Sequence, residues 1–276
     1  MTRLLLSLCL LLQPSTVWAQ GNSRIDATEF EAPVSVFKLP KTLVEISGLA
    51  PAGEKSVYGH NDEHAIIHEI SVEDGTVLRS FALGEPTVAG DFEAIARIGA
   101  FIYLVTSDGL IYEARPQPHA QRATYNVYDT GLAKTCEIEG MAPAEEGGLL
   151  LLCKRSTLNK RRDRLILYRW RFEDRLNEKT PLINVALRDL APRPVEGSFR
   201  ASGLERDANT GNLLIIDSNA GAVLEITLGG AKVAYHAIGS KAHPQPEGVA
   251  ILPSGLFVIA DEGRKKKGAL SVYKPR

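Results

Sequence analysis

The 276-residue sequence lacks an excess of charge of either sign, with 32 lysines and arginines against 33 aspartates and glutamates. Nucleic-acid-binding proteins usually concentrate basic residues on one face, so this balance argues against a nucleic-acid partner. Two basic runs, at 159–164 and 264–268, lie between strand-like segments, and we interpret them as solvated hairpin tips. The sequence also lacks the G-x-S-x-G motif and the G-x-x-x-x-G-K-[ST] loop. It therefore offers neither a nucleophile elbow nor a phosphate-binding loop.

The amino-terminal residues have the pattern of an export signal. An arginine precedes an apolar run from Leu4 to Leu12, and the residues ending at Ala19 resemble a cleavage site. The run is shorter than the about 20 apolar residues that a membrane helix needs. We therefore expect residues 1–19 to be removed and the protein to be periplasmic or secreted. An uncleaved anchor in the inner membrane is the alternative, and a membrane contact is expected only in that case.

The mature chain repeats one short phrase. Five segments align, namely ISGLA from Ile46, FEAIA from Phe92, IEGMA from Ile138, ASGLE from Ala201 and PEGVA from Pro246. Their starts are 46, 46, 63 and 45 residues apart, and we interpret the segment 188–200 within the longest step as an inserted loop. Period-two alternation dominates each unit, and no helical stripe of useful length appears. Units of about 45 residues with several strands are typical of β-propeller blades.

The last unit is one strand short, while the strand-like segment 32–39 has no partner in the first unit. We therefore predict an all-β, five-bladed β-propeller whose ring is closed by the amino-terminal strand joining the last blade. Such closure removes exposed sheet edges. Residues 20–31 are expected to form a flexible amino terminus, and residues 32–276 a single propeller domain.

Acidic residues gather where the first strand of each unit begins. In a propeller this strand lines the channel and the second strand runs back, so the start of one and the end of the other share a mouth. The polar residues at these places are Asp91, Glu93, Glu137, Glu139 and Glu247 at the starts, and His60, Asn61, Asp62, Ser107, Asp108, Lys154, Asp217, Ser218, Asp261 and Glu262 at the ends. Converging carboxylates need compensation, and calcium accepts about six to eight oxygen ligands with loose geometry. Two interpretations stay open: a calcium site, or a hydrogen-bonded, hydrated channel lining.

Histidines and serines offer further candidates. His60, His64 and His68 would share a face on a helix, but the repeat places them on strand, turn and strand, which argues against zinc. His60 and Asp62 at the mouth remain candidates as metal ligands or as a general base. Ser47 and Ser202 replace glutamate in two units. We interpret them as small residues filling a narrow axis, with a serine nucleophile as the alternative.

After removal of the leader, Cys136 and Cys153 are the two cysteines that remain. They flank the hairpin of the third unit, and in a symmetric hairpin centred on 143–148 they would lie opposite each other. An exported pair can oxidise, so we predict a disulfide between them. Two buried free thiols are the alternative.

The order of the phrases ISGLA, DFEAIA, TCEIEGMA, ASGLE with LLIIDSNAGAVLEITLGG, and QPEGVAILPSGLFVIADEG resembles the SdiA-regulated, YjiK-like family of bacterial proteins over residues 45–273. The resemblance implies a five-bladed propeller distantly related to NHL-repeat propellers, a calcium site, and a short export or membrane segment. It also implies that Glu93, Glu139 and Glu247, at the matching phrase, are calcium ligands. Lys154 and Arg155 depart from the acidic pattern and could partly neutralise the mouth.

These features favour an exported, non-enzymatic calcium-binding propeller of the cell envelope, whose acidic mouth binds a small molecule or an envelope protein. The alternative is a calcium-dependent hydrolase, such as a phytase-like esterase or a lactonase, in which the ion polarises an ester or phosphate and His60 or a carboxylate activates water. A third interpretation is an interaction module without metal. The resemblance implies no settled enzyme activity, and the fold alone supplies none.

Overall fold

The computed structural model describes residues 23–145, 147–156, 163–178, 180–192, 199–264 and 266–276. The predicted signal peptide, residues 1–19, and most of the basic run 159–164 lie outside the described residues. Among these described residues, two short 3₁₀ helices occur, η1 (Lys41–Leu43) and η3 (Leu187–Asp189). Within the described ranges, no helix has the length and apolar character needed to cross a membrane.

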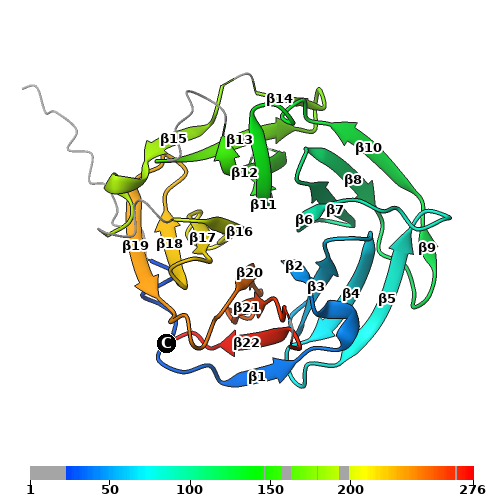
Figure 1. Ribbon diagram of the computed structural model, residues 1–276, viewed down its shortest axis with the longest axis horizontal. Coiled ribbons are helices and arrows are strands. Elements are labelled where there is room, and N and C mark those ends of the chain that lie inside the picture. Colours follow the sequence, from blue (N-terminus) through cyan, green and yellow to red (C-terminus); the bar gives the residue numbers. More distant parts are fainter. Residues whose placement is uncertain (1–22, 146, 157–162, 179, 193–198, 265) are drawn as a thin grey trace, which may run out of the picture.

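Five antiparallel sheets form the blades of a β-propeller, as predicted (Figure 1). Blade 1 contains β2 (Ile46–Pro51), β3 (Ser56–Asn61), β4 (Ile66–Ser71) and β5 (Val77–Leu83), with β9 (Arg122–Ala123) added parallel to β5. Blade 2 contains β6 (Phe92–Ile98), β7 (Phe101–Thr106), β8 (Leu110–Ala114) and β10 (Tyr125–Asp129). Blade 3 contains β11 (Cys136–Ala144), β12 (Gly148–Ser156) and β13 (Arg164–Arg171), and β13 pairs with both β14 (Leu176–Asn177) and β15 (Ile183–Ala186). Blade 4 contains β16 (Ala201–Arg206), β17 (Leu213–Asp217), β18 (Ala222–Ile226) and β19 (Lys232–Ala237).

Blade 5 closes the ring. It contains β20 (Pro246–Ile251), β21 (Phe257–Asp261) and β22 (Ala269–Tyr273), and its outer strand is β1 (Ser35–Lys38), which pairs antiparallel with β22. The structure therefore confirms closure by the amino-terminal strand. Figure 1 shows β2, β6, β11, β16 and β20 as the inner strands around the channel. Each of them contacts the inner strands of the two neighbouring blades.

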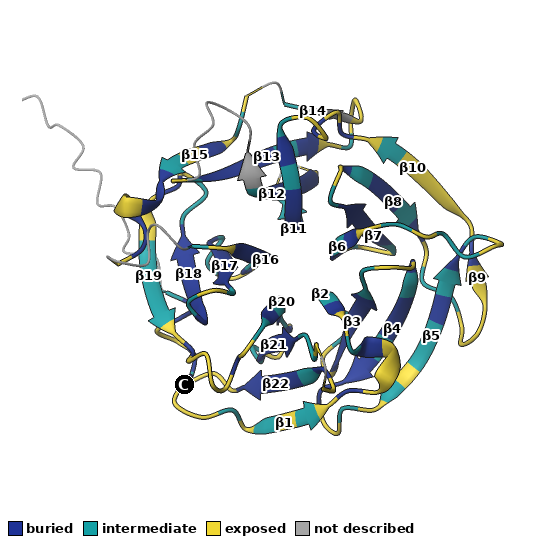
Figure 2. Cartoon of the chain, viewed as in Figure 1, coloured by how far each residue is buried: buried dark blue, intermediate teal, exposed yellow. Residues whose placement is uncertain are grey.

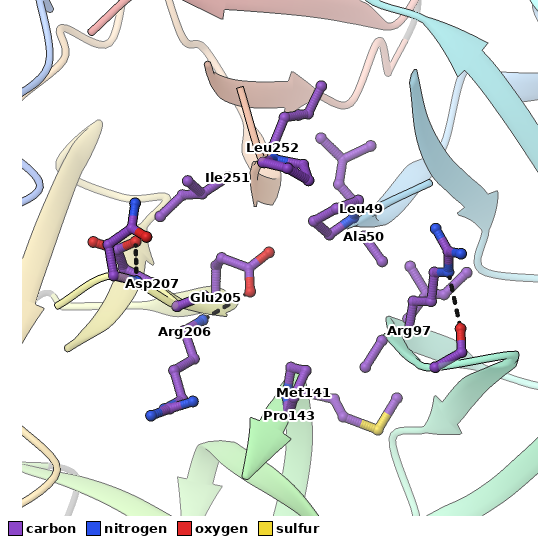
Figure 3. A pocket seen from close by; sticks show the side chains of 17 residues that line it. Leu49, Ala50, Arg97, Met141, Pro143, Glu205, Arg206, Asp207, Ile251 and Leu252 are labelled. Atoms are coloured by element: carbon purple, nitrogen blue, oxygen red, sulfur yellow. Dashed lines mark hydrogen bonds between the residues drawn. The ribbon is translucent and has the colours of Figure 1, made fainter. Parts of the chain in front are cut away.

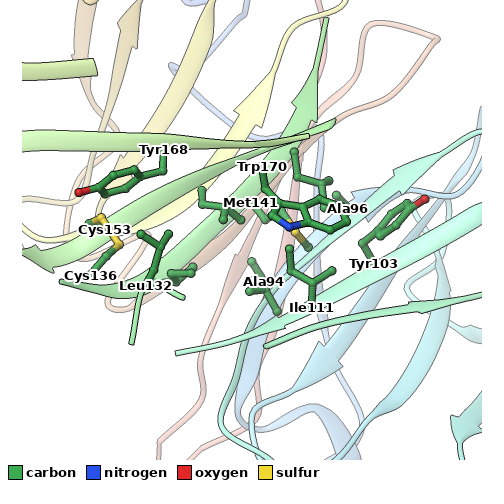
Figure 4. Packing of buried hydrophobic residues seen from close by; sticks show 14 of the residues in the cluster. Ala94, Ala96, Tyr103, Ile111, Leu132, Cys136, Met141, Cys153, Tyr168 and Trp170 are labelled. Carbon is green, nitrogen blue, oxygen red and sulfur yellow. A yellow bond between two sulfur atoms is a disulfide. The ribbon is translucent and has the colours of Figure 1, made fainter. Parts of the chain in front are cut away.

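One cluster of buried apolar side chains lies between each pair of neighbouring blades. Representative pairs around the ring are Ile67 with Leu104, Ile111 with Leu151, Leu167 with Leu224, Ile216 with Ile259, and Val258 with Ile70. Burial is therefore concentrated in the inner and middle strands, and exposure in the outer strands and turns (Figure 2). The cluster between blades 2 and 3 includes the buried Trp170 and Met141 (Figure 4). Apolar packing between sheets thus fixes the five blades around the channel.

Cys136 and Cys153 form a disulfide with a Cα–Cα distance of 5.3 Å, which confirms the predicted bridge. The register differs from the symmetric hairpin that the sequence suggested. Cys136 pairs with Ser156, and Cys153 pairs with Ile138, because two bulges shift β11 relative to β12. The two cysteines therefore lie diagonally across the ladder, at the end of blade 3 where β11 begins.

Residues 23–30 pack against the ring, in contrast to the flexible segment expected over 20–31. The backbone N–H groups of Arg24 and Ile25 donate to the buried carboxylate of Glu225 at 2.9 and 3.0 Å. The guanidinium of Arg24 donates two hydrogen bonds to Asp207, at 2.9 and 3.1 Å. Phe30 is buried in the cluster between blades 4 and 5. The segment therefore acts as a latch on these two blades, and we call residues 23–30 the amino-terminal latch.

Candidate functional sites at the two ends of the channel

Every inner strand carries a β-bulge at the second residue of its repeat phrase. The register against the second strand of the blade shifts around Ser47, Glu93, Glu139, Ser202 and Glu247. A bulge leaves its extra residue out of the ladder and re-aims the side chain. We call this end of the channel the acidic mouth. The repeated bulge explains why side chains at one sequence position meet near the axis.

The bulge residues meet in one small cavity. Ser47, Glu93, Glu139 and Glu247 all line it. The fifth residue, Ser202, is buried, and its hydroxyl donates to the carbonyl oxygen of Pro246 at 2.7 Å. The three glutamates that the sequence analysis named are therefore brought together from blades 2, 3 and 5.

Glycine follows the bulge in four of the five blades, where inner strands approach closely. A Cβ placed on Gly140 would lie 2.8 Å from Cβ of Leu204, and one on Gly203 would lie 2.7 Å from the carbonyl oxygen of Glu247. Cβ atoms in proteins essentially never approach other atoms within 3.0 Å. Glycine at these positions thus permits the inner strands to approach closely, while Ala94 takes the same place in blade 2.

Lys154 brings a positive charge into the acidic mouth. Its ammonium forms an ion pair with Glu139 and lies 3.9 Å from Glu137. The side chains of Lys154 and Glu139 are 14% and 3% exposed, so the pair is largely shielded from water. The partial neutralisation predicted for Lys154 is therefore confirmed, whereas the side chain of Arg155 lies outside the description.

Burial raises the pKa of Glu93 and that of Glu247 to about 7. The charge of Lys154 lowers both pKa values, whereas Asp91 and Asp62 raise that of Glu93. Near neutral pH both carboxyls are consequently a mixture of protonated and ionised forms. Burial in the acidic mouth thus favours the protonated forms of both carboxyls, although Lys154 and, for Glu247, Arg200 act in the opposite direction.

The predicted calcium positions share a cavity but are not arranged around an ion-sized point. Across the part of the chain that the structure describes, no three His, Cys, Asp or Glu side chains form a group that could hold a metal ion. The ammonium of Lys154 lies against one of the carboxylates instead. Three carboxylates and the hydroxyl of Ser47 nevertheless have the oxygen chemistry that calcium prefers. The set would fit calcium only after Lys154 leaves Glu139 and the carboxylates close around the ion.

The two catalytic candidates, His60 and Asp62, differ in burial. His60 is fully buried, with Nδ1 2.9 Å from the carbonyl oxygen of Asn61, and burial lowers its pKa to about 4. Asp62 lies nearer the acidic mouth, where its charge contributes to the raised pKa of Glu93. Because His60 exposes no surface to solvent, we derive no proton-transfer step from this pair.

Asp217 and Asp261, which the sequence also placed at the mouth, are buried in the sheets. Asp217 accepts a hydrogen bond from the backbone N–H of Arg200 at 3.1 Å. Asp261 lies 2.7 Å from Nδ1 of His243, whose Nε2 lies 2.6 Å from the hydroxyl of Tyr273. Asp217 and Asp261, at the ends of β17 and β21, thus contact the segments that precede β16 and β20 rather than face the channel.

A larger cavity, of about 560 Å³, lies at the opposite end of the channel, where the inner strands end (Figure 3). We call it the distal cavity. Its apolar lining includes Leu49, Ile95, Met141, Ile251 and Leu252. Figure 3 shows the side chain of Glu205 directed into the space between these residues. Glu205 is 6% exposed, and burial raises its pKa to about 8.

The distal cavity was not predicted from the sequence, although the sequence contains a signal for it. Glu205 occupies the last position of the phrase ASGLE, where the other four phrases end in alanine. Those alanines, Ala50, Ala96, Ala142 and Ala250, are all buried. A glutamate at a position that is otherwise a buried alanine marks a local exception to the repeat.

Comparison of the sequence with family models gives no match, and comparison with curated proteins gives none either. The fold does match solved structures. Glutaminyl cyclase from Myxococcus xanthus aligns with a TM-score of 0.58 and 15% identity, over 88% of this chain and 96% of that one. A luciferin-regenerating enzyme gives 0.52 and 10%, over 87% and 95% of the two chains. The PQQ-bound aldose sugar dehydrogenase from Streptomyces coelicolor gives 0.52 and 11%, over 89% and 100%.

These likenesses show that the chain shares its fold with proteins whose names state enzyme activities. At such low identity they transfer no activity, because propellers host many unrelated functions. Membership of the SdiA-regulated, YjiK-like family stays a prediction from the sequence phrases.

Proposed function

We propose that the protein is an exported, non-enzymatic binding propeller of the SdiA-regulated, YjiK-like type, and that its acidic mouth binds calcium in competition with the ammonium of Lys154. The observation that carries the proposal is the convergence of Glu93, Glu139 and Glu247 on one cavity. Burial raises the pKa of two of these carboxyls, Glu93 and Glu247, to about 7, so keeping them ionised costs free energy that a bound cation would offset. A divalent cation would relieve the repulsion more fully than one ammonium.

Export is supported by two features. The leader has the pattern of a signal peptide, and the Cys136–Cys153 disulfide is typical of an oxidising compartment such as the periplasm or the cell exterior. The calcium ion would hold the bulge side chains in place and present the acidic mouth to a small molecule or an envelope protein.

Calcium titration calorimetry of the full-length chain, expressed with its own leader and freed of metal with a chelator, tests the proposal. We expect saturable binding, weakened about tenfold or more by Glu139→Gln, because calcium affinity follows the number of charged oxygen ligands. The matched control is Glu73→Gln, since the Glu73 side chain is 61% exposed on the outside of blade 1 and pairs with Lys55. Absence of binding to the folded wild type, or equal weakening by both substitutions, would exclude a calcium site at the acidic mouth.

A further inference from the structure

The distal cavity has a carboxyl group directed into it and two arginines at its edge. Glu205 supplies the carboxyl, and Arg97 and Arg206 are the arginines. Glu205 accepts a hydrogen bond from the backbone N–H of Arg206 at 2.8 Å, and its carboxyl faces the apolar lining (Figure 3). A cavity of about 560 Å³ with an apolar lining and a few buried polar groups has the size and character of a small-molecule site.

The charges around this cavity favour an anion. Asp207, which also lines it, is neutralised by the two hydrogen bonds from Arg24. Arg206 pairs through Nη2 with Glu145 at 3.0 Å, but the Glu145 side chain is 66% exposed, so solvent screens that pair. Arg97 donates to the carbonyl oxygens of Ala52 and Gly99.

Among the described residues, no carboxylate forms an ion pair with Arg97. Glu205 remains mostly protonated at neutral pH, since burial raises its pKa to about 8. The distal cavity is consequently an apolar space with a surplus of positive charge at its edge and a hydrogen-bond donor within it.

We propose that the distal cavity is a second binding site, which takes a small monocarboxylate with an apolar body. The ligand carboxylate accepts a hydrogen bond from the carboxyl of Glu205 and is attracted by the positive charges of Arg97 and Arg206 at the edge of the cavity, and the apolar body lies against Ile95, Met141 and Leu252. An ammonium ligand would be repelled by Arg97 and Arg206. This site is distinct from the acidic mouth, although Leu49, Ile95 and Met141 line both cavities.

The proposal predicts proton-linked binding. Above about pH 8 the Glu205 carboxyl ionises and repels the anion, so the affinity falls. Glu205→Gln keeps the size of the side chain and an N–H donor but cannot ionise, so its affinity should stay level across that range. Glu205→Ala supplies a second variant, because alanine occupies the same position in the other four blades.

The chain itself provides a reporter. It contains two methionines, Met1 and Met141, and Met141 lines the distal cavity. The full-length chain, expressed with its own leader and isotope-labelled at the methionine methyls, would be titrated with sodium hexanoate and observed by NMR. A Met141→Leu spectrum identifies the Met141 signal. Hexylammonium chloride and hexanamide serve as probes of matched size with opposite or no charge.

We expect hexanoate to shift the Met141 signal saturably, hexanamide to bind more weakly, and hexylammonium to leave the signal unchanged. Arg206→Gln should weaken hexanoate binding about threefold or more, since it removes a positive charge at the edge of the cavity. Arg188→Gln is the control, because the Arg188 side chain is 62% exposed at η3. The proposal is overturned if hexanoate causes no saturable shift, if hexylammonium binds as well as hexanoate, or if hexanamide binds equally.

Discussion

The acidic mouth and the distal cavity are opposite ends of one channel, but they are built from different kinds of residue. The acidic mouth is made by a position that repeats, because a β-bulge in each blade turns the second residue of the phrase toward the axis. The chemistry of the distal cavity comes from residues that depart from the repeat. Glu205 stands where the other four phrases end in a buried alanine, and the residue after this position is an arginine only in blade 2 (Arg97) and blade 4 (Arg206). Repetition thus fixes where side chains point, and departures from it give the two ends different charge.

The two ends are also held differently. The disulfide joins β11 to β12 beside the acidic mouth. At the distal cavity the amino-terminal latch holds blade 4 through Arg24 and Asp207. The Cys136–Cys153 bridge is covalent and joins neighbouring strands of one blade. The Arg24–Asp207 ion pair is electrostatic and joins residues 183 positions apart.

Removing the ion pair between Arg24 and Asp207 should have the largest effect on the free energy of unfolding. Arg24→Met leaves Asp207 buried without its cation, and we expect the free energy of unfolding to fall by about 3–5 kcal/mol. Urea denaturation at pH 7 measures it. The control is Arg276→Gln, whose pair with Glu31 is 52% and 71% exposed and should contribute little. If both substitutions lower the free energy of unfolding equally, the amino-terminal latch does not stabilise the fold through the Arg24–Asp207 ion pair.

Removing the Cys136–Cys153 disulfide should have a smaller effect on the free energy of unfolding. Replacing both Cys136 and Cys153 by alanine should lower the free energy of unfolding by roughly 3 kcal/mol, because the unfolded chain regains the freedom that the bridge restricts. The measurement is urea denaturation of the variant and of the oxidised wild type. A loss equal to or greater than that of Arg24→Met would reverse the comparison between the two ends.

The pH dependence of stability separates the ends further. The pKa values of Glu93 and Glu247, about 7, and of Glu205, about 8, lie above the ordinary value of 4.5. Between pH 6.5 and 9 the folded state therefore binds more protons than the unfolded state, so the free energy of unfolding falls as the pH rises. His60 and His68, with pKa values lowered to about 4, have the opposite effect, but only below pH 6.5.

Glu205→Gln removes the contribution of the distal cavity and should reduce this fall by roughly 1–2 kcal/mol. The remaining fall belongs to the acidic mouth and should respond to Glu247→Gln instead. Thermal unfolding followed at several pH values in this window measures both parts. If Glu205→Gln leaves the fall in the free energy of unfolding unchanged, the carboxyl of Glu205 is already ionised at neutral pH.

The repeat phrase made most of the fold predictable. The spacing of the phrase predicted five blades, and the short last unit predicted closure of the ring by β1. The acidic residue shared by three phrases predicted that Glu93, Glu139 and Glu247 converge. The docking of the amino-terminal latch was not predictable, because its partners Asp207 and Glu225 lie far along the chain and carry no local pattern. The cysteine register was missed because bulges shift β11, and a bulge depends on the partner strand as much as on its own sequence.

The measurement that tests the account most directly is a calcium titration of Lys154→Met beside the wild type, by calorimetry at pH 8. If the ammonium of Lys154 competes with calcium at the acidic mouth, its removal should tighten calcium binding about tenfold or more, because an attached cation is lost and the three carboxylates remain. Unchanged affinity would show that calcium binds elsewhere. No binding to either folded protein would contradict the account, and side-chain cations such as Lys154 and Arg200 would then be what offsets the acidic mouth.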